Sequence, residues 1–390
     1  MDVIHGHTEP GFERLAEVFA ANFNVRNDVG AAFAAVLDGR MVVDLWGGAA
    51  DSAGRSWRED TMQLIFSGTK GVTALCVAIL VDRGQLRLED PVCLYWPEFA
   101  AHGKQAITVA EVLSHRARLP GVRTPIGVQE MLDSEGMAAL LADQVPETDP
   151  RGAGFIYHGL TYGWLCDALV RCVDGRSVGR FFAQEVAEPL GLELWIGLPA
   201  ELESRVAILQ YAPAWGMASN TRAKPFPGDQ LWASMYENPR LWPPDPGALW
   251  NLPALHAAEL PAANAIGVAR SIARLYGALA QGGEIDGIRI VSADTLALVR
   301  TPLVSGPHPF TGEAMAFGAG FALQTENLPF GPPPAAFGHI GMGGSTHGAW
   351  PDERVGFSYA MNEMRDELEG DERAKALLDV LYTIIRKTGR

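Results

Sequence analysis

The chain has 390 residues, 48% of them apolar, which is typical of a globular protein with a sizeable core in one large or two medium domains. Its 31 basic and 46 acidic residues give a formal net charge of −15. This excess of acidic residues argues against nucleic acid or an anionic membrane as a partner, and solubility is its simplest explanation.

The sequence lacks the patterns of metal-binding and membrane proteins. Its four cysteines are not spaced as zinc ligands or as a Cys-x-x-Cys pair, so no metal or other cofactor is expected. Cys76 and Cys166 are predicted to be buried thiols. His5 and His7 are expected to lie in a disordered terminus. No basic and apolar leader opens the sequence and no apolar run approaches ~18 residues, which predicts a cytoplasmic protein.

The N-terminal part predicts one helix followed by strands. Apolar residues recur on one side of Phe12–Phe23, which indicates an amphipathic helix. The apolar runs Ala31–Leu37 and Met41–Trp46 are predicted strands, and the Asp38-Gly39 pair between them indicates a hairpin. After a polar loop, Met62–Phe66 is a further predicted strand, and a helix begins directly after it.

Ser67 and Lys70 open that helix three positions apart, so they share one of its faces. A serine hydroxyl is a weak nucleophile that needs a base, and a lysine can serve when burial lowers its pKa. With 14 serines and 5 lysines in the chain, chance gives this spacing roughly one time in five, and a capping serine beside a surface lysine is the simpler explanation. The setting favours catalysis, because Lys70 is the one charged residue between Met62 and Val81.

Helices dominate the middle of the chain. Thr108 and Glu111 form a capping box, which predicts a helix start. Three further stretches are predicted helices: Met131–Ala142, Leu160–Val173 and Gly179–Leu190. From Ala212 to Leu260, tryptophans mix with many prolines, which predicts a loop-rich insertion. Ala265–Leu279 is then a predicted helix again.

The C-terminal part predicts four strands and a closing helix, Asp371–Arg386. The strands are Phe317–Gln324, Ala336–Ile340, Thr346–Trp350 and Val355–Met361. Strands at both ends of the chain predict an α/β fold of the α+β type, in which an antiparallel sheet from residues 1–100 and 283–390 is flanked by helices. Residues 101–282 then form a mostly helical domain with the insertion at about residues 212–260, and the active site is expected between the two parts.

Two further stretches suit a hydrolytic site. Tyr157 stands ahead of a predicted helix, and a nearby ammonium group favours its phenolate form, although a half-buried core tyrosine is the simpler explanation. His158 beside it is a candidate base, although a lone histidine is usually structural. In the glycine-rich stretch Phe337–Ser345, the backbone N–H of Met342 can face a developing oxyanion together with that of Ser67. A plain turn between strands is the alternative for this stretch.

Taken together and in this order, the three pieces resemble the serine hydrolases related to class C β-lactamases and penicillin-binding proteins, with the family VIII carboxylesterases as the nearest subgroup. The Ser-x-x-Lys motif of that family matches Ser67 and Lys70. Its Tyr-x-Asn motif matches Tyr157-His158-Gly159 at the tyrosine, and its Lys-Thr-Gly motif matches His339-Ile340-Gly341 at the glycine.

A fourth stretch extends the likeness. Leu113–Pro120 looks like the Leu-Ser-His-x-x-Gly-Leu-Pro segment of the family, with Arg118 where a glycine is usual. The departures at Gly159 and His339 fall where the β-lactamases hold the amide and the carboxylate of the antibiotic. A neutral or weakly charged imidazole replaces a permanent cation poorly, so the departures favour neutral esters.

The resemblance implies a β-lactamase/transpeptidase-like fold and acyl transfer to Ser67, with Lys70 and Tyr157 as coupled general base and acid. It also implies an oxyanion hole formed by the backbone N–H groups of Ser67 and Met342. The expected substrate-binding residues are His158, His339, Ile340, Gly341 and Gly343.

The sequence therefore predicts a carboxylesterase that hydrolyses short-chain acyl esters of small molecules. The alternatives are a β-lactamase or D-amino-acid peptidase-type amide hydrolase, an acyltransferase to an alcohol acceptor, and an inactive binding module. The Gly-x-Ser-x-Gly, His-Glu-x-x-His and P-loop motifs of other enzyme classes are absent from the sequence. The natural ester and the oligomeric state are left open.

Overall fold

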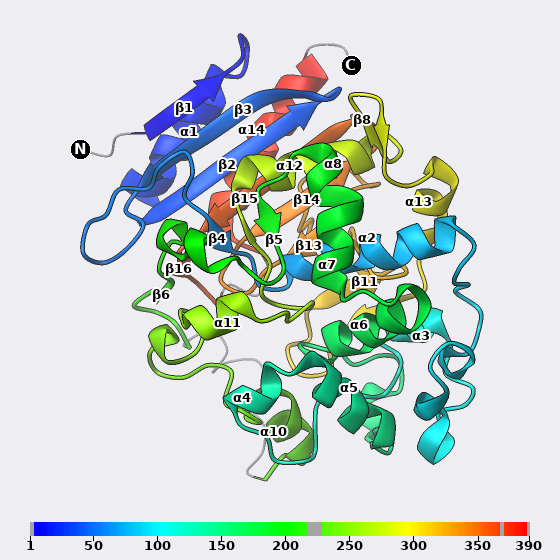
Figure 1. Cartoon of the computed structure of the whole chain (residues 1–390). Helices are drawn as coiled ribbons and strands as arrows, with labels where there is room; N and C mark the ends of the chain where they lie inside the picture. The colour runs from blue at the N-terminus through cyan, green and yellow to red at the C-terminus, as the bar shows by residue number, and fades with distance from the viewer. Residues whose placement is uncertain (1–3, 217–227, 367–369, 388–390) are drawn as a thin grey trace.

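The computed structural model describes residues 4–216, 228–366 and 370–387. Its main feature is an antiparallel sheet with the strand order β1-β3-β2-β15-β14-β13-β12-β11-β10 (Figure 1). The N-terminal strands are β1 (Ile4–Thr8), β2 (Gly30–Leu37) and β3 (Arg40–Gly48). The C-terminal strands are β10 (Val304–Pro307), β11 (Ala314–Phe317), β12 (Ala322–Leu323), β13 (Phe337–Ile340), β14 (Thr346–Trp350) and β15 (Val355–Met361). The predicted sheet from both ends of the chain is confirmed.

The centre of the sheet joins the two ends of the chain. β2 pairs with β15 in a register that sets Ala31 opposite Met361. Every residue of β2 is buried, and the strand accordingly reads as a continuous apolar run rather than an alternating one. Asp38 and Gly39 turn the chain from β2 to β3 with φ angles of 50° and 80°, which confirms the predicted hairpin.

The sheet extends further than predicted at both edges. His5 and His7 belong to β1, which pairs with β3, so the predicted disorder of this segment is wrong. The predicted strand Phe317–Gln324 is instead the hairpin of β11 and β12, in which Gly320 has a φ of 94°. These short strands are stabilised by pairing with neighbouring strands. The alternation of residues along a short segment does not predict such pairing.

Helices cover both faces of the sheet (Figure 1). α1 (Glu13–Val25) and α14 (Glu372–Lys387) pack together on one face. On the other face, α12 (Ala269–Ala280) lies across β2, β14 and β15, and α2 (Gly68–Asp82) lies against β13. Helices were predicted at all four places. α2 is buried along nearly its whole length, because it also packs against the helical part of the chain.

The middle of the chain is mostly helical, as predicted. Its helices are α3 (Val109–Leu113), α4 (Val128–Met131), α5 (Ser134–Asp143), α6 (Thr161–Asp174), α7 (Val178–Phe182) and α8 (Glu188–Leu190). The predicted helix Met131–Ala142 is interrupted at Asp133, whose side chain caps α5 by accepting the N–H of Gly136. A π-helical turn at Ala183–Ala187 joins α7 to α8, so Gly179–Leu190 is helical throughout.

Short strands link the helical part to the main sheet region. β4 (Gln63–Leu64), β7 (Ile266–Gly267) and β5 (Leu194–Trp195) form a sheet in that order. β4 is shorter than the predicted strand Met62–Phe66, and β7 takes the first residues of the predicted helix Ala265–Leu279. The remaining short strands pair as β6 (Gln210–Tyr211) with β16 (Glu363–Met364) and β8 (Glu284–Ile285) with β9 (Ile288–Arg289).

The insertion predicted at about residues 212–260 is loop-rich and includes α10 (Gln230–Tyr236) and α11 (Pro253–Ala257). Its residues 217–227 lie outside the described residues. The boundaries between a sheet domain and a helical domain stay a prediction. α12 belongs to the segment predicted as the helical domain, yet it packs on the main sheet.

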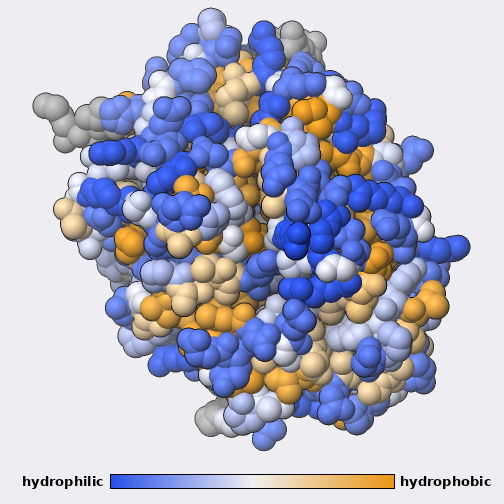
Figure 2. Space-filling model, in the orientation of Figure 1, coloured by the Kyte–Doolittle hydropathy of each residue, from blue (hydrophilic) through white to orange (hydrophobic). Residues whose placement is uncertain are grey.

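Hydrophilic side chains cover most of the face seen in Figure 2, and apolar side chains lie among them in scattered groups. Of the helices in the described residues, none combines the length and the apolar character needed to cross a membrane. Cys76 and Cys166 are buried free thiols, as predicted. Across residues 4–216, 228–366 and 370–387, acidic, histidine and cysteine side chains form no group that could hold a metal ion.

Thr108 should contribute to stability, because the predicted capping box is present in α3. Its hydroxyl accepts the N–H of Glu111 at 3.2 Å, and the Glu111 carboxylate accepts the N–H of Thr108 at 2.9 Å. Thr108→Ala removes one half of this box and should lower the free energy of unfolding by about 1 kcal/mol in a urea titration. Thr124→Ala, at an exposed threonine outside the helices, is the control. Equal effects of the two substitutions would contradict a role for the box.

Candidate active site

Ser67 lies at a sharp turn between β4 and α2. The preceding residue, Phe66, has a φ of 46°, a left-handed conformation that is strained for an aromatic side chain. Ser67 is partly exposed at the start of α2, while the rest of the first helical turn is buried. The dipole of this 15-residue helix adds a positive potential at the serine.

Lys70 is fully buried one turn after Ser67. Its Nζ lies 3.1 Å from the Ser67 Oγ, 2.7 Å from the carbonyl oxygen of Gly159 and 3.0 Å from that of Ala262. Within the described chain, no carboxylate pairs with this lysine. Burial therefore lowers the pKa of Lys70 from its ordinary 10.5 to about 7. At neutral pH a large share of the lysine is thus a neutral amine within hydrogen-bonding distance of the serine hydroxyl.

Tyr157 lies in the loop before α6, with its ring centroid 4.8 Å from the Lys70 Nζ. Burial raises the pKa of the Tyr157 phenol, and a hydrogen bond with Ser67 offsets part of that rise. The resting phenol is therefore protonated, which corrects the expectation that Lys70 favours its phenolate form. A protonated phenol beside a neutral amine is set to donate a proton, while the amine accepts one.

Both ring nitrogens of His158 are bonded to backbone groups, so its role as a substrate-binding residue gains no support and stays a prediction. Its fully buried imidazole accepts the N–H of Leu119 at Nε2, at 3.2 Å, so Nδ1 carries the proton and donates to the Ile156 carbonyl at 2.6 Å. Burial lowers the pKa of His158 to about 4 and keeps the ring neutral. The His158 N–H also donates to His115 Nδ1 at 3.1 Å. His158 thus anchors the loop that carries Tyr157.

The glycine-rich loop after β13 packs against the segment that leads to Ser67. A Cβ on Gly341 would lie 2.2 Å from the carbonyl oxygen of Ile65, so this close approach requires glycine. Met342 is 40% exposed at the tip of the loop. Over the described residues, the N–H groups of Ser67 and Met342 donate to no other group of the protein. Both predicted oxyanion donors are therefore available to a ligand.

The other predicted substrate-binding residues of this loop differ in their exposure to solvent. Ile340 is half-buried, whereas His339 is only 3% exposed, with its Nδ1 3.2 Å from the carbonyl oxygen of Ile340. Burial and the neighbouring Lys70 lower the pKa of His339 to about 3, so the imidazole is neutral. Gly343 has a φ of 92°, a conformation that favours glycine. The position at which the related β-lactamases carry a lysine thus brings no positive charge here.

Arg118 explains a departure from the family motif. Its φ of 59° is the left-handed conformation in which glycine is least strained, which accounts for the glycine usual at this position. The guanidinium donates to the carbonyl groups of Glu147, Asp149 and Gly152 at 2.5, 2.9 and 2.5 Å respectively. These three bonds hold the chain that leads to Tyr157, and they offset the backbone strain.

An aromatic cluster that the motifs did not reveal includes Phe66, the residue before Ser67. Its members are Phe66, Trp215, Trp242 and Trp250. Phe66 lies 5.8 Å from Trp242 and 4.9 Å from Trp250, measured between ring centroids. Trp250 is buried and donates its indole N–H to the Leu241 carbonyl, so it supports the loop. Trp215 and Trp242 are half-buried and 5.8 Å apart. The tryptophan content of the insertion was the available signal for this cluster.

A second aromatic group surrounds Tyr157. His115 and Phe317 lie 4.6 and 5.9 Å from the tyrosine ring, and Trp232 of the insertion packs at 5.4 Å from Phe310 in a neighbouring small cluster. The structure thus brings Ser67, Lys70 and Tyr157 together between apolar and aromatic side chains.

Known proteins share both the sequence and the fold of this chain. The sequence model of the beta-lactamase family matches residues 19–382. The "Esterase/beta-lactamase LipL" of Mycobacterium tuberculosis is 37% identical over 370 residues, which cover 92% of this chain and 82% of that protein.

Two solved structures are similar over nearly the whole chain. One, described as a family VIII carboxylesterase, is 37% identical with a TM-score of 0.89 and covers 98% of this chain and 100% of its own. The other, a penicillin-binding protein homolog from Caulobacter crescentus, is 35% identical with a TM-score of 0.89 and the same coverage. The chain therefore belongs to the beta-lactamase family of serine hydrolases and has the β-lactamase/transpeptidase-like fold that its motifs predict.

Proposed function

We propose that this protein is a carboxylesterase that hydrolyses small acyl esters through an acyl-enzyme on Ser67. The observation that carries the proposal is the Lys70 Nζ, 3.1 Å from the Ser67 Oγ and buried without a carboxylate partner in the described chain. A pKa of about 7 gives this amine the basicity that a general base needs near neutral pH.

The proposed reaction has two steps. In acylation, the neutral Lys70 accepts the Ser67 proton as Oγ attacks the ester carbonyl, and the oxyanion receives the N–H groups of Ser67 and Met342. The phenol of Tyr157 donates a proton to the departing alcohol and regains one from Lys70. In deacylation the same two groups take a proton from the attacking water and return it to the Ser67 Oγ as the bond to the acyl group breaks and the acid leaves. Lys70 and Tyr157 share the proton throughout, so their titration belongs to the pair.

Neutral esters suit the site better than β-lactams do. Gly159 stands where the family motif has an asparagine, so it offers no side-chain amide to a substrate. The buried His339 is neutral, so it does not balance the negative charge of an anionic substrate. The alternative of β-lactamase activity is supported by the double description of the Mycobacterium relative as esterase and β-lactamase. Acyl transfer to an alcohol acceptor needs only an alcohol in place of water, and added alcohol would then change the product ratio.

The aromatic cluster supports a limit on acyl size. Trp242 is half-buried beside Phe66, the residue before Ser67, and the half-buried Trp215 packs against Trp242. We propose that they form the wall of the acyl pocket, at the edge between the sheet region and the helical part. An apolar wall selects acyl chains by size, at roughly 1–3 kcal/mol per methylene group.

Esters and β-lactams can be compared directly. We expect kcat/KM for a nitrophenyl acetate to exceed that for a chromogenic cephalosporin by at least about tenfold, because the cephalosporin carboxylate meets no cation at the position of His339. Preference for the cephalosporin would contradict the assignment as an esterase.

Ser67→Ala should reduce ester hydrolysis to less than ~1% and abolish the acyl adduct seen by intact mass, because the covalent step is lost. Activity retained in Ser67→Ala would contradict the assignment of Ser67 as the nucleophile.

Ester hydrolysis should rise with pH around the pKa of Lys70. Below about pH 7 the buried lysine is protonated and cannot accept the serine proton, whereas above it the amine is free to do so. A profile of kcat/KM between about pH 5 and pH 9 should therefore increase with a midpoint near 7. Circular dichroism at each pH controls for unfolding. A midpoint near the ordinary lysine value, or a profile flat across the range, would contradict this role.

Trp242→Ala should widen the acyl pocket. We expect the rate with an octanoate ester to rise by roughly tenfold relative to that with an acetate ester, because space opens for the longer chain. Trp46→Ala is the matched control, since Trp46 is also half-buried but stacks on His5 at the edge of the main sheet. If Trp242→Ala lowers the acetate, butyrate and octanoate rates in equal proportion, the tryptophan is structural and the pocket wall lies elsewhere.

A further inference from the structure

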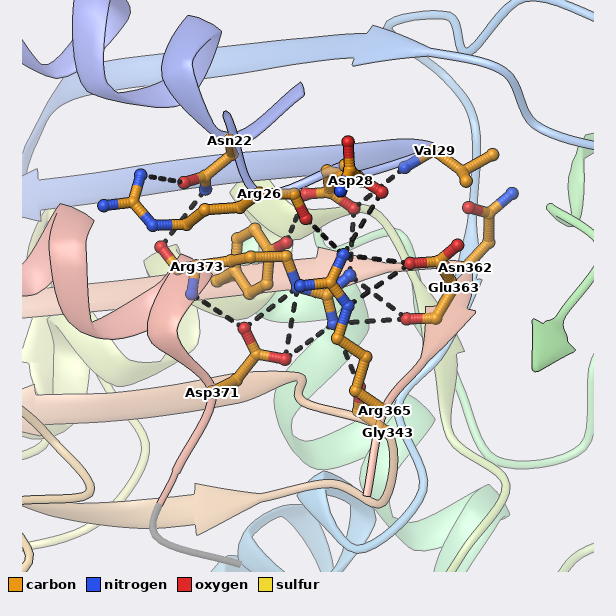
Figure 3. A network of polar contacts seen from close by, with 12 residues as sticks. Asn22, Arg26, Asp28, Val29, Gly343, Asn362, Glu363, Arg365, Asp371 and Arg373 are labelled. Carbon is orange, nitrogen blue, oxygen red and sulfur yellow. Dashed lines mark hydrogen bonds and ion pairs between the residues drawn. The ribbon is translucent and has the colours of Figure 1, made fainter. Parts of the chain in front are cut away.

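Arg373, in the first turn of α14, is a fully buried cation at the junction of several segments (Figure 3). Its Nε lies 2.9 Å from the Asp371 Oδ1, and its Nη2 lies 2.6 Å from the Asp371 Oδ2. Its Nη1 lies 3.0 Å from the Asp28 Oδ1, in the turn before β2. Tyr359 of β15 donates its hydroxyl to the other oxygen of Asp28. The cation thus joins the two ends of the chain.

The same guanidinium reaches the glycine-rich loop of the active site. Its Nη2 donates to the carbonyl of Gly343 at 3.1 Å, and both terminal nitrogens lie 3.2 Å from the carbonyl of Glu363. The backbone N–H of Arg365 donates to the same Gly343 carbonyl at 3.0 Å. Gly343 directly follows Met342, whose N–H is the second proposed oxyanion donor.

The glycine-rich loop packs directly against Asp371 and Arg373. A Cβ on Gly344 would lie 2.0 Å from the Asp371 Oδ2 and 3.0 Å from the Arg373 Nη2. Within the loop, Gly341 donates its N–H to the Ser345 carbonyl at 2.8 Å, and Gly344 donates to the Gly341 carbonyl at 3.2 Å. The loop is therefore a closed turn, and Arg373 holds it from behind.

Stability alone does not account for a buried arginine. Moving a guanidinium out of water costs several kcal/mol, and apolar side chains of similar volume often stabilise a core at least as well as a buried ion pair. What the guanidinium adds is direction, because its five N–H groups lie fixed in one plane. In this network those groups point to Asp371, Asp28 and two backbone carbonyls, which define the position of the loop.

We propose that Arg373 is a positioning residue for the oxyanion hole, in that it fixes the Gly343 carbonyl and thereby the loop that presents the Met342 N–H. The inference rests on the proposed function of Ser67 as nucleophile. Arg373 itself touches no reacting atom. Its effect arises because an oxyanion donor displaced by ~1 Å loses much of its hydrogen bond in the transition state.

Arg373→Lys tests the proposal, because it keeps the charge but replaces the planar fork with a flexible stem. We expect kcat for ester hydrolysis to fall by about 10- to 100-fold, somewhat less than on removal of an oxyanion donor, with little change in KM. The midpoint of the pH profile should not move, since Lys70 is untouched. A merely structural role would instead lower the melting temperature, and kcat would recover at assay temperatures far below it.

Arg270→Lys is the matched control, because Arg270 pairs with Asp44 of β3 at 2.8 Å and is expected to leave kcat unchanged. If Arg373→Lys does not fold, Gly344→Ala moves the loop from its own side and should also lower kcat with KM unchanged. Wild-type kcat in a folded Arg373→Lys or Gly344→Ala protein overturns the positioning role. Failure of the proposed function is recognised separately, because the wild-type protein then forms no acyl adduct on Ser67.

Discussion

The site depends on a lysine amine that is held out of water and has no carboxylate partner among the described residues. Had a carboxylate been within reach of Lys70, the ion pair would have kept the lysine protonated at neutral pH. The structure instead offers the Nζ two backbone carbonyls and the serine hydroxyl. Carbonyl groups satisfy the donors of the amine but do not compensate a full charge, so burial lowers its pKa. Lys70 is therefore basic enough to accept the Ser67 proton because no carboxylate of the described chain pairs with its amine.

The side chains around Lys70 follow the same rule. Burial lowers the pKa of His115, His158, His339 and His347 below the ordinary value, and it raises the pKa of the Tyr157 phenol. At neutral pH these groups carry no charge. In the proposed acyl transfer, the developing charge lies in surroundings of low polarity, where oriented backbone N–H groups stabilise it more strongly than in water. The precise placement of the glycine-rich loop matters for this reason.

Features set by neighbours in sequence could be predicted, and those set by distant partners could not. The spacing of Ser67 and Lys70, the Thr108 capping box and strands β13 to β15 depend on a few adjacent residues, and the structure has them as predicted. His158 was predicted to bind substrate because it stands in the motif, yet its Nδ1 bonds the nearby Ile156 carbonyl and its Nε2 bonds the N–H of Leu119, 39 positions earlier. Arg373 gave no signal, since its partner Asp28 lies near the other end of the chain. The catalytic roles themselves stay predictions.

The pairing of β2 with β15 has a consequence for synthesis of the protein on the ribosome. The partner of Ala31 is Met361, which is made about 330 residues later, so the centre of the sheet cannot form until translation has passed β15. The helices between them depend on more local contacts and can form while the chain is still growing. Until β15 is made, one edge of the apolar strand β2 stays unpaired. An unpaired strand edge can pair with another chain and so promotes aggregation. A message truncated before β15 would therefore yield a chain that exposes this edge permanently, whatever the state of its catalytic residues.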